Sequence, residues 1–304
     1  LTRAPGAEIT LEANPGTVEA GKFRDFRAAG INRLSLGIQS FDPRHLKALG
    51  RIHDEREARR AIGEARAHFD NFNLDLMYGL PGQSVEEALA DIEQALAFDP
   101  PHLSCYHLTI EPNTRFHRFP PKLPDEDAAA AMQDVIEERL AAAGYDHYET
   151  SAYARTANTV SGHCAHNLNY WTFGDYLGVG AGAHGKLSFP GRIVRQARIK
   201  HPERYMAGVE GAGAVEAERE VGVDEIPVEF MMNALRLNAG FPLVLFEERA
   251  GLPFTAILRE LDAAERRGLI ERDHLRIAPS ARGRRFLNDL LLLSLAPKHQ
   301  IPHA

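Results

Sequence analysis

Cysteine is scarce in this chain, with two residues, Cys105 and Cys164, among 304. Two cysteines give no disulfide framework of the kind that holds small secreted domains together. The default compartment is therefore a reducing one, and we expect a cytoplasmic protein.

Long hydrophobic runs and excess positive charge are also absent. No run approaches the roughly 18 apolar residues of a membrane span, so we expect no membrane span. The formal net charge is -7, so bulk electrostatics suggests no nucleic-acid partner. What is present is ordinary globular composition, 44% hydrophobic and 25% charged, with enough length for one large domain and a smaller one.

The first half of the chain alternates strand and helix patterns. Apolar residues alternate with polar ones in four segments, and a helical pattern follows each of them. Two helices open with capping boxes, Asp54 with Glu57 and Ser84 with Glu87, and Thr17 reads as the N-cap of a helix that runs to about Ala29. The four strand segments are 8–14, 33–39, 72–79 and 103–110. Such alternation predicts a parallel sheet or barrel.

Three consecutive strands carry a polar residue near their carboxyl ends, on the face opposite their aliphatic residues: Glu12, Gln39 and Asp75. Any one of them is equally well explained by a strand becoming polar where it meets water. Three in succession favour a shared polar ligand, because α/β folds bind ligands at this edge.

Beyond Tyr145 the pattern changes. Residues 145–154, YDHYETSAYA, read as one further strand. Residues 162–185, GHCAHNLNYWTFGDYLGVGAGAHG, are dense in His, aromatics and Gly, too irregular for a helix and long enough to predict a functional loop. Its GAGAHG run matches a dinucleotide fingerprint, but no helix comes after it that could hold a pyrophosphate, so tight backbone packing or close approach of a flat ligand explains the small residues better.

His163, Cys164 and His166 lie within four positions and raise the question of zinc. Structural zinc needs four ligands, and no second cluster of suitable spacing exists, so we do not expect a standalone site. Imidazole and thiolate are also axial ligands of haem iron, and Tyr170 and Trp171 could cover a porphyrin face. A hydrogen-bonded core is the alternative that composition favours.

The C-terminal part, from about Ile226, is predicted to be mainly helical, with a hairpin near residues 269–279 and a last apolar helix. This arrangement resembles a winged helix, so a DNA-binding regulator is a distant alternative. Its recognition helix, 254–268, mixes acidic and basic residues and offers little counterion release.

Seven motifs occur in an order that resembles one protein family: EANPGT, SLGIQSF, LGRIHD, NLDLMYGLPGQ, LTIEPNT, HNLNYW and DYLGVGAGAH. The family is that of radical S-adenosylmethionine (SAM) proteins related to oxygen-independent coproporphyrinogen III oxidase. LTIEPNT and HNLNYW are most similar to the haem-chaperone branch of the HemW type.

The resemblance implies a partial (β/α)6 radical SAM barrel with a small, winged-helix-like C-terminal domain. It places SAM at Glu12, Gln39, Arg51, Asp75, Thr109 and His184. It places haem at the HNxxYW motif, which is His166, Asn167, Tyr170 and Trp171. The domains expected are an incomplete barrel over 1–150, a connecting segment over 151–225 and a helical domain over 226–304.

The resemblance also implies a [4Fe-4S] cluster, whose ligands in the family lie in an N-terminal Cys-x-x-x-Cys-x-x-Cys loop. This chain has no such loop, and Cys105 and Cys164 match none of its positions. The chain starts at Leu1 and runs almost directly into a strand, so we expect upstream βα units to be missing and the cluster ligands with them. No metal ligand is therefore assigned to this chain.

The function expected is that of a haem chaperone that passes haem to acceptor apoproteins. The alternative is a radical SAM enzyme that decarboxylates coproporphyrinogen III in haem biosynthesis. The sequence leaves open whether the chain forms a homodimer.

Overall fold

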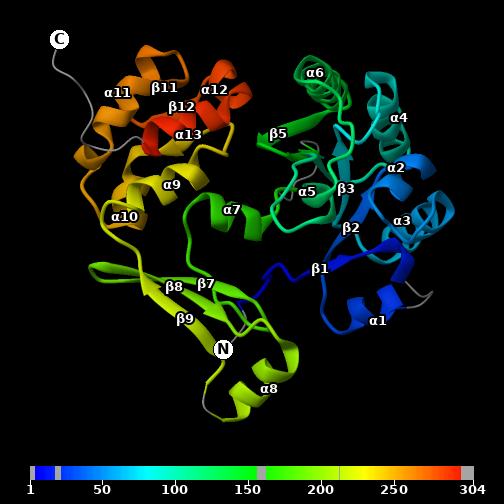
Figure 1. Cartoon of the computed structure of the whole chain (residues 1–304), viewed down its shortest axis with the longest axis horizontal. Coiled ribbons are helices and arrows are strands. Elements are labelled where there is room, and N and C mark those ends of the chain that lie inside the picture. The colour runs from blue at the N-terminus through cyan, green and yellow to red at the C-terminus, as the bar shows by residue number, and fades with distance from the viewer. Residues whose placement is uncertain (1–3, 18–21, 156–161, 212, 296–304) are drawn as a thin grey trace. The chain divides into compact units, whose positions relative to one another are not determined.

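The computed structural model describes residues 4–17, 22–155, 162–211 and 213–295. It divides into two compact units, 1–163 and 164–304. The elements of both units are labelled in Figure 1. The three-part division at residues 150 and 225 stays a prediction.

The N-terminal unit alternates strands and helices, as the sequence predicts. Its elements are β1 (Thr10–Ala13), η1 (Pro15–Thr17), α1 (Lys22–Ala28), β2 (Arg33–Gln39), α2 (Pro43–Ala48), α3 (Glu55–His68), β3 (Phe72–Tyr78), α4 (Val85–Leu96), β4 (His102–His107), α5 (Arg115–Arg118), α6 (Glu126–Ala142), β5 (Tyr145–Glu149) and β6 (Ala152–Arg155). Both expected capping boxes are present, at the start of α3 and of α4. Residues 18–21 lie outside the described residues, so the N-cap at Thr17 stays a prediction.

One sheet holds the strands of this unit in the order β1-β2-β3-β4-β6-β5. The first four strands are parallel, which confirms the alternation read from the sequence. The single strand expected over 145–154 is wrong, because β5 and β6 form an antiparallel hairpin and β6 takes the place beside β4. The turn falls at Thr150 and Ser151, and neither residue is the Gly or Pro that would have marked it.

The core of the N-terminal unit lies between this sheet and its helices. Leu34, Leu36 and Ile38 of β2 are fully buried, and they pack in one cluster with residues of α3, α4 and α6. Because side chains alternate across a strand, the intervening polar residues of β2 face the other side of the sheet. The structure thus separates an apolar face, covered by helices, from a polar one.

The C-terminal unit contains α7 (Ala165–Trp171), β7 (His184–Phe189), β8 (Arg192–Arg198), α8 (Pro202–Glu210), β9 (Val215–Glu220), α9 (Ile226–Ala234), β10 (Phe241–Pro242), α10 (Leu243–Ala250), η2 (Phe254–Ala256), α11 (Leu258–Arg266), β11 (Ile270–Arg272), β12 (Arg276–Pro279), α12 (Ala281–Arg285) and α13 (Leu287–Leu295). Strands β7, β8 and β9 form an antiparallel sheet, and β10, β12 and β11 form a second one. The expected hairpin is β11–β12 and the mainly helical character of this region is confirmed, whereas its likeness to a winged helix stays a prediction. None of the described helices is long and apolar enough to cross a membrane.

The segment 162–185 is more regular than its composition suggests. Residues 165–171 form the short helix α7, so the expectation that this segment holds no helix is wrong. The helix lacks a side-chain cap at Cys164, and its Asn and aromatic residues are weak helix formers, so local propensity gave no signal for it. The helix α7 packs against α9, and this tertiary contact supports it where local propensity does not.

Candidate functional site

The polar face of the N-terminal sheet gathers the strand-end residues that the sequence singled out. Glu12 of β1 is paired in register with Ser35 of β2, and the Ser35 hydroxyl donates a hydrogen bond of 2.9 Å to Asp75 of β3. Glu12 and Asp75 therefore lie near one another across β2. Burial raises the pKa of Asp75 above its ordinary value, against the opposing effect of hydrogen bonds from Ser35 and Asn73, and the negative charge of Glu12 adds to the rise.

Asn73 is the centre of a hydrogen-bonded network beneath this carboxylate. Its Nδ2 donates to Ser35 Oγ at 2.7 Å and to Asp75 Oδ1 at 2.8 Å. Its Oδ1 lies 2.7 Å from His102 Nδ1 and accepts a bond of 3.1 Å from Ser104 Oγ. An amide oxygen only accepts, so this geometry assigns the His102 proton to Nδ1.

Gln39 and Arg51 meet at a second point, at the end of β2. Gln39 has a φ of 69°, which is uncommon for a residue other than glycine, and it is buried. A Cβ added to Gly37 would lie 3.0 Å from Gln39 Nε2 and 3.3 Å from Asn14 Oδ1, so Gly37 leaves room for both amides. The Arg51 guanidinium donates to Asn14 Oδ1 at 3.3 Å. Gln39, Arg51 and Asn14 therefore form one polar group at this edge.

The roles implied for Thr109 and His184 toward SAM stay predictions. Thr109 is exposed after β4, and His184 lies in the C-terminal unit, at the start of β7. Ser35, Asn73 and Asn14 were not predicted. The sequence pattern could have identified Ser35 and Asn73, because they alternate with Leu34, Leu36 and Leu74 on their strands and so share the polar face.

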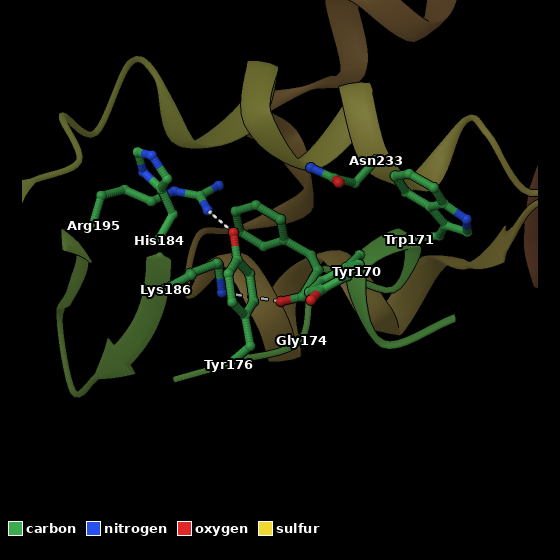
Figure 2. Close-up of a pocket in the computed structure, with 9 residues that line it drawn as sticks. Tyr170, Trp171, Gly174, Tyr176, His184, Lys186, Arg195 and Asn233 are labelled. Atoms are coloured by element: carbon green, nitrogen blue, oxygen red, sulfur yellow. Dashed lines mark hydrogen bonds between the residues drawn. The ribbon is translucent and has the colours of Figure 1, made fainter. Parts of the chain in front are cut away.

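A pocket of about 360 Å³ lies in the C-terminal unit (Figure 2). Its lining comes from α7, the loop that follows it, β7, β8 and α9, and consists of Tyr170, Trp171, Phe173, Gly174, Tyr176, His184, Lys186, Arg195 and Asn233. Two residues of the HNxxYW motif, Tyr170 and Trp171, therefore lie in this pocket together with His184. His166 and Asn167 are not among its lining residues.

Aromatic rings define the shape of the pocket. The Tyr170 and Tyr176 rings meet edge to face, with centroids 4.7 Å apart. The Arg236 guanidinium lies 4.2 Å from the centre of the Trp171 ring, and the indole Nε1 is buried without a hydrogen-bond partner among the described residues. Buried donors without a partner are rare, and a ligand or water often completes them. In Figure 2, Trp171 lies on one side of the view and His184 on the other.

Two cationic side chains, Lys186 and Arg195, fix the positions of residues around the pocket. The Lys186 ammonium is buried and donates to Phe173 O, Asp175 Oδ1 and Ser188 Oγ, each at 3.0 Å. Burial lowers the pKa of Lys186, although the ion pair with Asp175 opposes this shift. Arg195 donates to Tyr176 Oη at 2.8 Å and to Glu229 at 2.6 Å, which fixes the orientation of the Tyr176 ring.

Gly185 at the end of the GAGAHG run, and Gly178 just before the run, serve close backbone packing, one of the two explanations that the sequence suggested. Gly180 and Gly182 have positive φ values instead, of 111° and 73°. A Cβ added to Gly178 would lie 2.4 Å from the backbone oxygen of His184, and one added to Gly185 would lie 3.1 Å from the Gly178 nitrogen. The loop before β7 is thereby pressed against that strand. The GAGAHG run leads into strand β7 and not into a helix, which agrees with the rejection of a dinucleotide site.

The cofactors implied by the resemblance fit this chain unequally. Cys105 and Cys164 are its only cysteines, both are buried, and they lie in different units. They do not fit a [4Fe-4S] cluster, which takes several thiolates together. The polar groups at the sheet edge fit SAM, since a carboxylate, an amide and a guanidinium match its amino-acid and ribose groups. The aromatic pocket with an exposed imidazole fits haem.

Comparison with known proteins gives consistent results. Residues 1–95 match the model of the radical SAM superfamily, and residues 223–286 match that of the HemN C-terminal domain. The chain is 49% identical to heme chaperone HemW of Escherichia coli (strain K12), over 97% of this chain and 77% of that protein. It is 33% identical to heme chaperone HemW of Bacillus subtilis (strain 168), over 93% of this chain and 75% of that protein.

The fold is also that of a solved relative. A structure of coproporphyrinogen III oxidase (HemN) from Escherichia coli superposes with a TM-score of 0.76 at 22% identity, covering 95% of this chain and 69% of that one. At this identity the likeness shows the α/β fold alone. The sequence relatives decide the branch, and the chain belongs to the HemW heme-chaperone family of the radical SAM superfamily.

Proposed function

We propose that the chain binds haem in the aromatic pocket of its C-terminal unit and passes it to acceptor apoproteins. The observation that carries this proposal is the meeting of Tyr170, Trp171 and His184 in one pocket of about 360 Å³. Flat aromatic faces cover a macrocycle, and an imidazole can ligate its iron. The relatives named heme chaperone support the same function. His166 and Asn167 stay in the proposal as neighbours of this pocket on α7.

SAM is the second ligand that we propose, at the polar edge of the N-terminal sheet. Glu12 and Asp75 supply carboxylates for hydroxyl and amino groups, and Arg51 supplies a planar cation for a carboxylate. Gln39 adds an amide that Gly37 leaves free to turn toward a ligand. Thr109, on the exposed segment after β4, and His184 stay additional candidates. Cys105 and Cys164 do not fit a [4Fe-4S] cluster, so no role for such a cluster is proposed in this chain.

The compartment that we propose for haem exchange is the cytoplasm. Cys105 and Cys164 are both buried and neither forms a disulfide, and burial raises the pKa of the Cys105 thiol. Thiols kept in this state suit a reducing environment. The name heme chaperone of the relatives supports acceptor apoproteins as partners, and whether the chain forms a homodimer stays open.

Titration with haemin tests the proposal. Wild-type protein should give a saturable change in the Soret absorbance, and it should then lose haem to added apomyoglobin. Trp171→Leu and Tyr170→Leu should weaken binding by roughly threefold to tenfold each, because an aromatic face contributes about 0.5 to 1.5 kcal/mol beyond area burial.

The matched control is Phe189→Leu, an exposed aromatic residue of the same unit that does not line the pocket. It should bind haemin as wild type does. Equal losses in all three variants, or no saturable change in wild type, would contradict the proposal.

A further inference from the structure

We propose that a second pocket of the C-terminal unit, at the C-terminal end of α11, binds a nucleoside diphosphate. Arginine side chains would hold the phosphates, an aromatic ring would stack on the base, and a carboxylate would accept hydrogen bonds from the ribose. This pocket shares no lining residue with the aromatic pocket around Trp171. The proposal therefore goes beyond the proposed binding of haem and SAM and depends on neither.

The pocket has a volume of about 470 Å³, which lies within the range of small-ligand sites. Helix α13 packs against both α11 and α12, so the three helices that form the pocket lie together (Figure 1). The lining residues are Arg266, Arg267, Leu269, Arg282, Phe286 and Asp289. Three arginines, one aromatic ring and one carboxylate therefore surround one cavity.

The arginines of this pocket carry positive charge that is not paired with a carboxylate of the described residues. Arg266 and Arg267 are exposed and form no ion pair there, and the side chain of Arg282 donates only to a backbone oxygen, that of Arg267, at 3.3 Å. Arg272 on β11, by contrast, donates to two carboxylates, at 2.8 Å and 2.7 Å. Guanidinium groups without a carboxylate partner are available to phosphate oxygens, which they match in geometry.

Backbone contacts fix the two sides of the pocket relative to one another. A Cβ added to Gly283 of α12 would overlap the backbone oxygen of Leu269, so α12 begins in direct contact with the segment after α11. The Ser280 amide donates to the same oxygen at 3.0 Å, and Ser280 Oγ donates to Gly268 O at 2.7 Å. A site that is formed before its ligand arrives loses less conformational entropy on binding.

Phe286 and Asp289 distinguish the expected ligand from a simple polyanion. Phe286 lines the pocket and is 48% exposed, so its ring is accessible for stacking on a base. Asp289 is exposed and lines the same pocket. Its carboxylate repels phosphate but accepts hydrogen bonds from ribose hydroxyls. A nucleoside diphosphate is anionic at one end and aromatic and hydroxylated at the other, so it matches all of these groups.

The charges around the pocket favour a small ligand over a nucleic-acid strand. Helix α11 carries Glu260, Asp262 and Glu265 ahead of its arginines, and the formal net charge of the chain is -7. Both features reduce the gain from counterion release along an extended phosphate backbone. A diphosphate held inside the pocket needs only the arginines that line it.

Isothermal titration calorimetry of the full chain with ADP, GDP, pyrophosphate and adenosine tests the proposal. ADP and GDP should bind at one site per chain, since stacking does not depend on the kind of base. Pyrophosphate, which lacks base and ribose, should bind about tenfold more weakly than ADP, and adenosine should not bind measurably. Arg266→Gln and Arg267→Gln should each weaken ADP binding by about tenfold, because each removes a charge-assisted hydrogen bond.

Two further variants separate the nucleoside contacts from the phosphate contacts. Phe286→Leu should weaken ADP binding by roughly threefold to tenfold and leave pyrophosphate binding unchanged. Asp289→Asn should weaken ADP binding by about threefold, whereas pyrophosphate should bind equally well or more tightly, because the neutral amide no longer repels it.

The matched control is Arg259→Gln, which replaces an exposed arginine of the same helix that does not line the pocket, and it should bind ADP as wild type does. No ADP binding by wild type, or binding that survives both Arg266→Gln and Arg267→Gln, would overturn the proposal. Equal affinities for ADP and pyrophosphate would overturn it too, because the site would then recognise phosphate alone. Tighter binding of a random duplex oligonucleotide than of ADP, lost in the same arginine variants, would identify a nucleic-acid surface instead.

Discussion

Asp91 on α4 is a buried carboxylate that holds the loop after Gln39 in place. It is 3% exposed, its Oδ2 accepts from Ser40 Oγ at 2.7 Å, and its Oδ1 accepts from the Phe41 amide at 2.7 Å. Burial raises the pKa of Asp91 from 3.8 to about 6, despite these two hydrogen bonds. The folded state therefore prefers the protonated form more strongly than the unfolded state does.

The sign of the pH effect follows from this raised pKa. The stabilising contribution of protonated Asp91 is fully present below pH 3.8 and is lost as the pH rises through about 6. The Asp91→Asn side chain is neutral at every pH, like the protonated carboxyl group, so the variant should not lose stability as the pH rises through about 6. The free energy of unfolding of the variant should rise relative to wild type by about 2 kcal/mol between pH 4 and pH 8.

Urea unfolding at several pH values measures this difference. Asp70→Asn, which replaces an exposed aspartate of the same unit, is the control and should follow the wild-type profile. Parallel profiles for Asp91→Asn and wild type would show that Asp91 does not govern this transition.

Gly37 controls the position of the Gln39 amide. In Gly37→Ala the new Cβ would lie 3.0 Å from Gln39 Nε2, and the flexible amide can move away at little cost in stability. We expect SAM affinity to fall by about tenfold, or 1.4 kcal/mol, while the unfolding temperature changes little. Isothermal calorimetry with SAM checks this, and unchanged affinity would remove Gln39 from the site.

Gly63 provides the contrasting substitution. It lies within α3, and an added Cβ meets no atom within 4 Å. Gly63→Ala should stabilise the protein by about 0.5 to 1 kcal/mol, because alanine loses less backbone entropy in a helix. It should leave SAM affinity unaltered.

At the scale of elements, strands β2, β3 and β4 are tied together by the Asn73 network as well as by their backbone ladders. The Asn73 side chain makes four hydrogen bonds, to Ser35, Asp75, His102 and Ser104. Asn73→Ala leaves the buried His102 N–H without its acceptor, so the free energy of unfolding should fall by about 2 to 4 kcal/mol.

Ser104→Ala is the matched comparison, since it removes one bond of the same network and should cost about 1 kcal/mol. Denaturant unfolding of both variants measures the two values. Equal costs would mean that Asn73 is not the centre of the network.

At the scale of the whole molecule, each unit has its own hydrophobic core. Leu74 is fully buried in the core of the N-terminal unit. Phe230 is fully buried in that of the C-terminal unit, where its ring meets those of Phe173, Phe241 and Phe246 edge to face. No residue belongs to both clusters among those described.

Separate cores predict separate effects of mutation. Phe230→Ala should destabilise the C-terminal unit by about 3 kcal/mol or more, and Leu74→Ala should do the same to the N-terminal unit. Scanning calorimetry should show two transitions, each lowered by one variant. A single transition that both variants lower equally would mean that the units unfold together.

The order of strands and helices in the N-terminal unit could be read from the chain, because it depends on local patterns. Alternating Leu34, Leu36 and Ile38 predict a strand, and Asp54 with Glu57 predicts the start of a helix. The same patterns missed the turn at Thr150 and Ser151 and the helix α7. Those elements depend on pairing with β4 and on contacts with α9, which no short window of sequence contains.

The site divides in the same way. The sequence by itself determined the family, through motifs such as HNLNYW, and the polar strand ends at Glu12, Gln39 and Asp75, because side-chain alternation along a strand is a local property. Only the tertiary structure decided that Asn73 links three strands and that His184 shares a pocket with Tyr170 and Trp171. Residues this far apart meet through strand pairing and helix packing, and these depend on the whole chain at once.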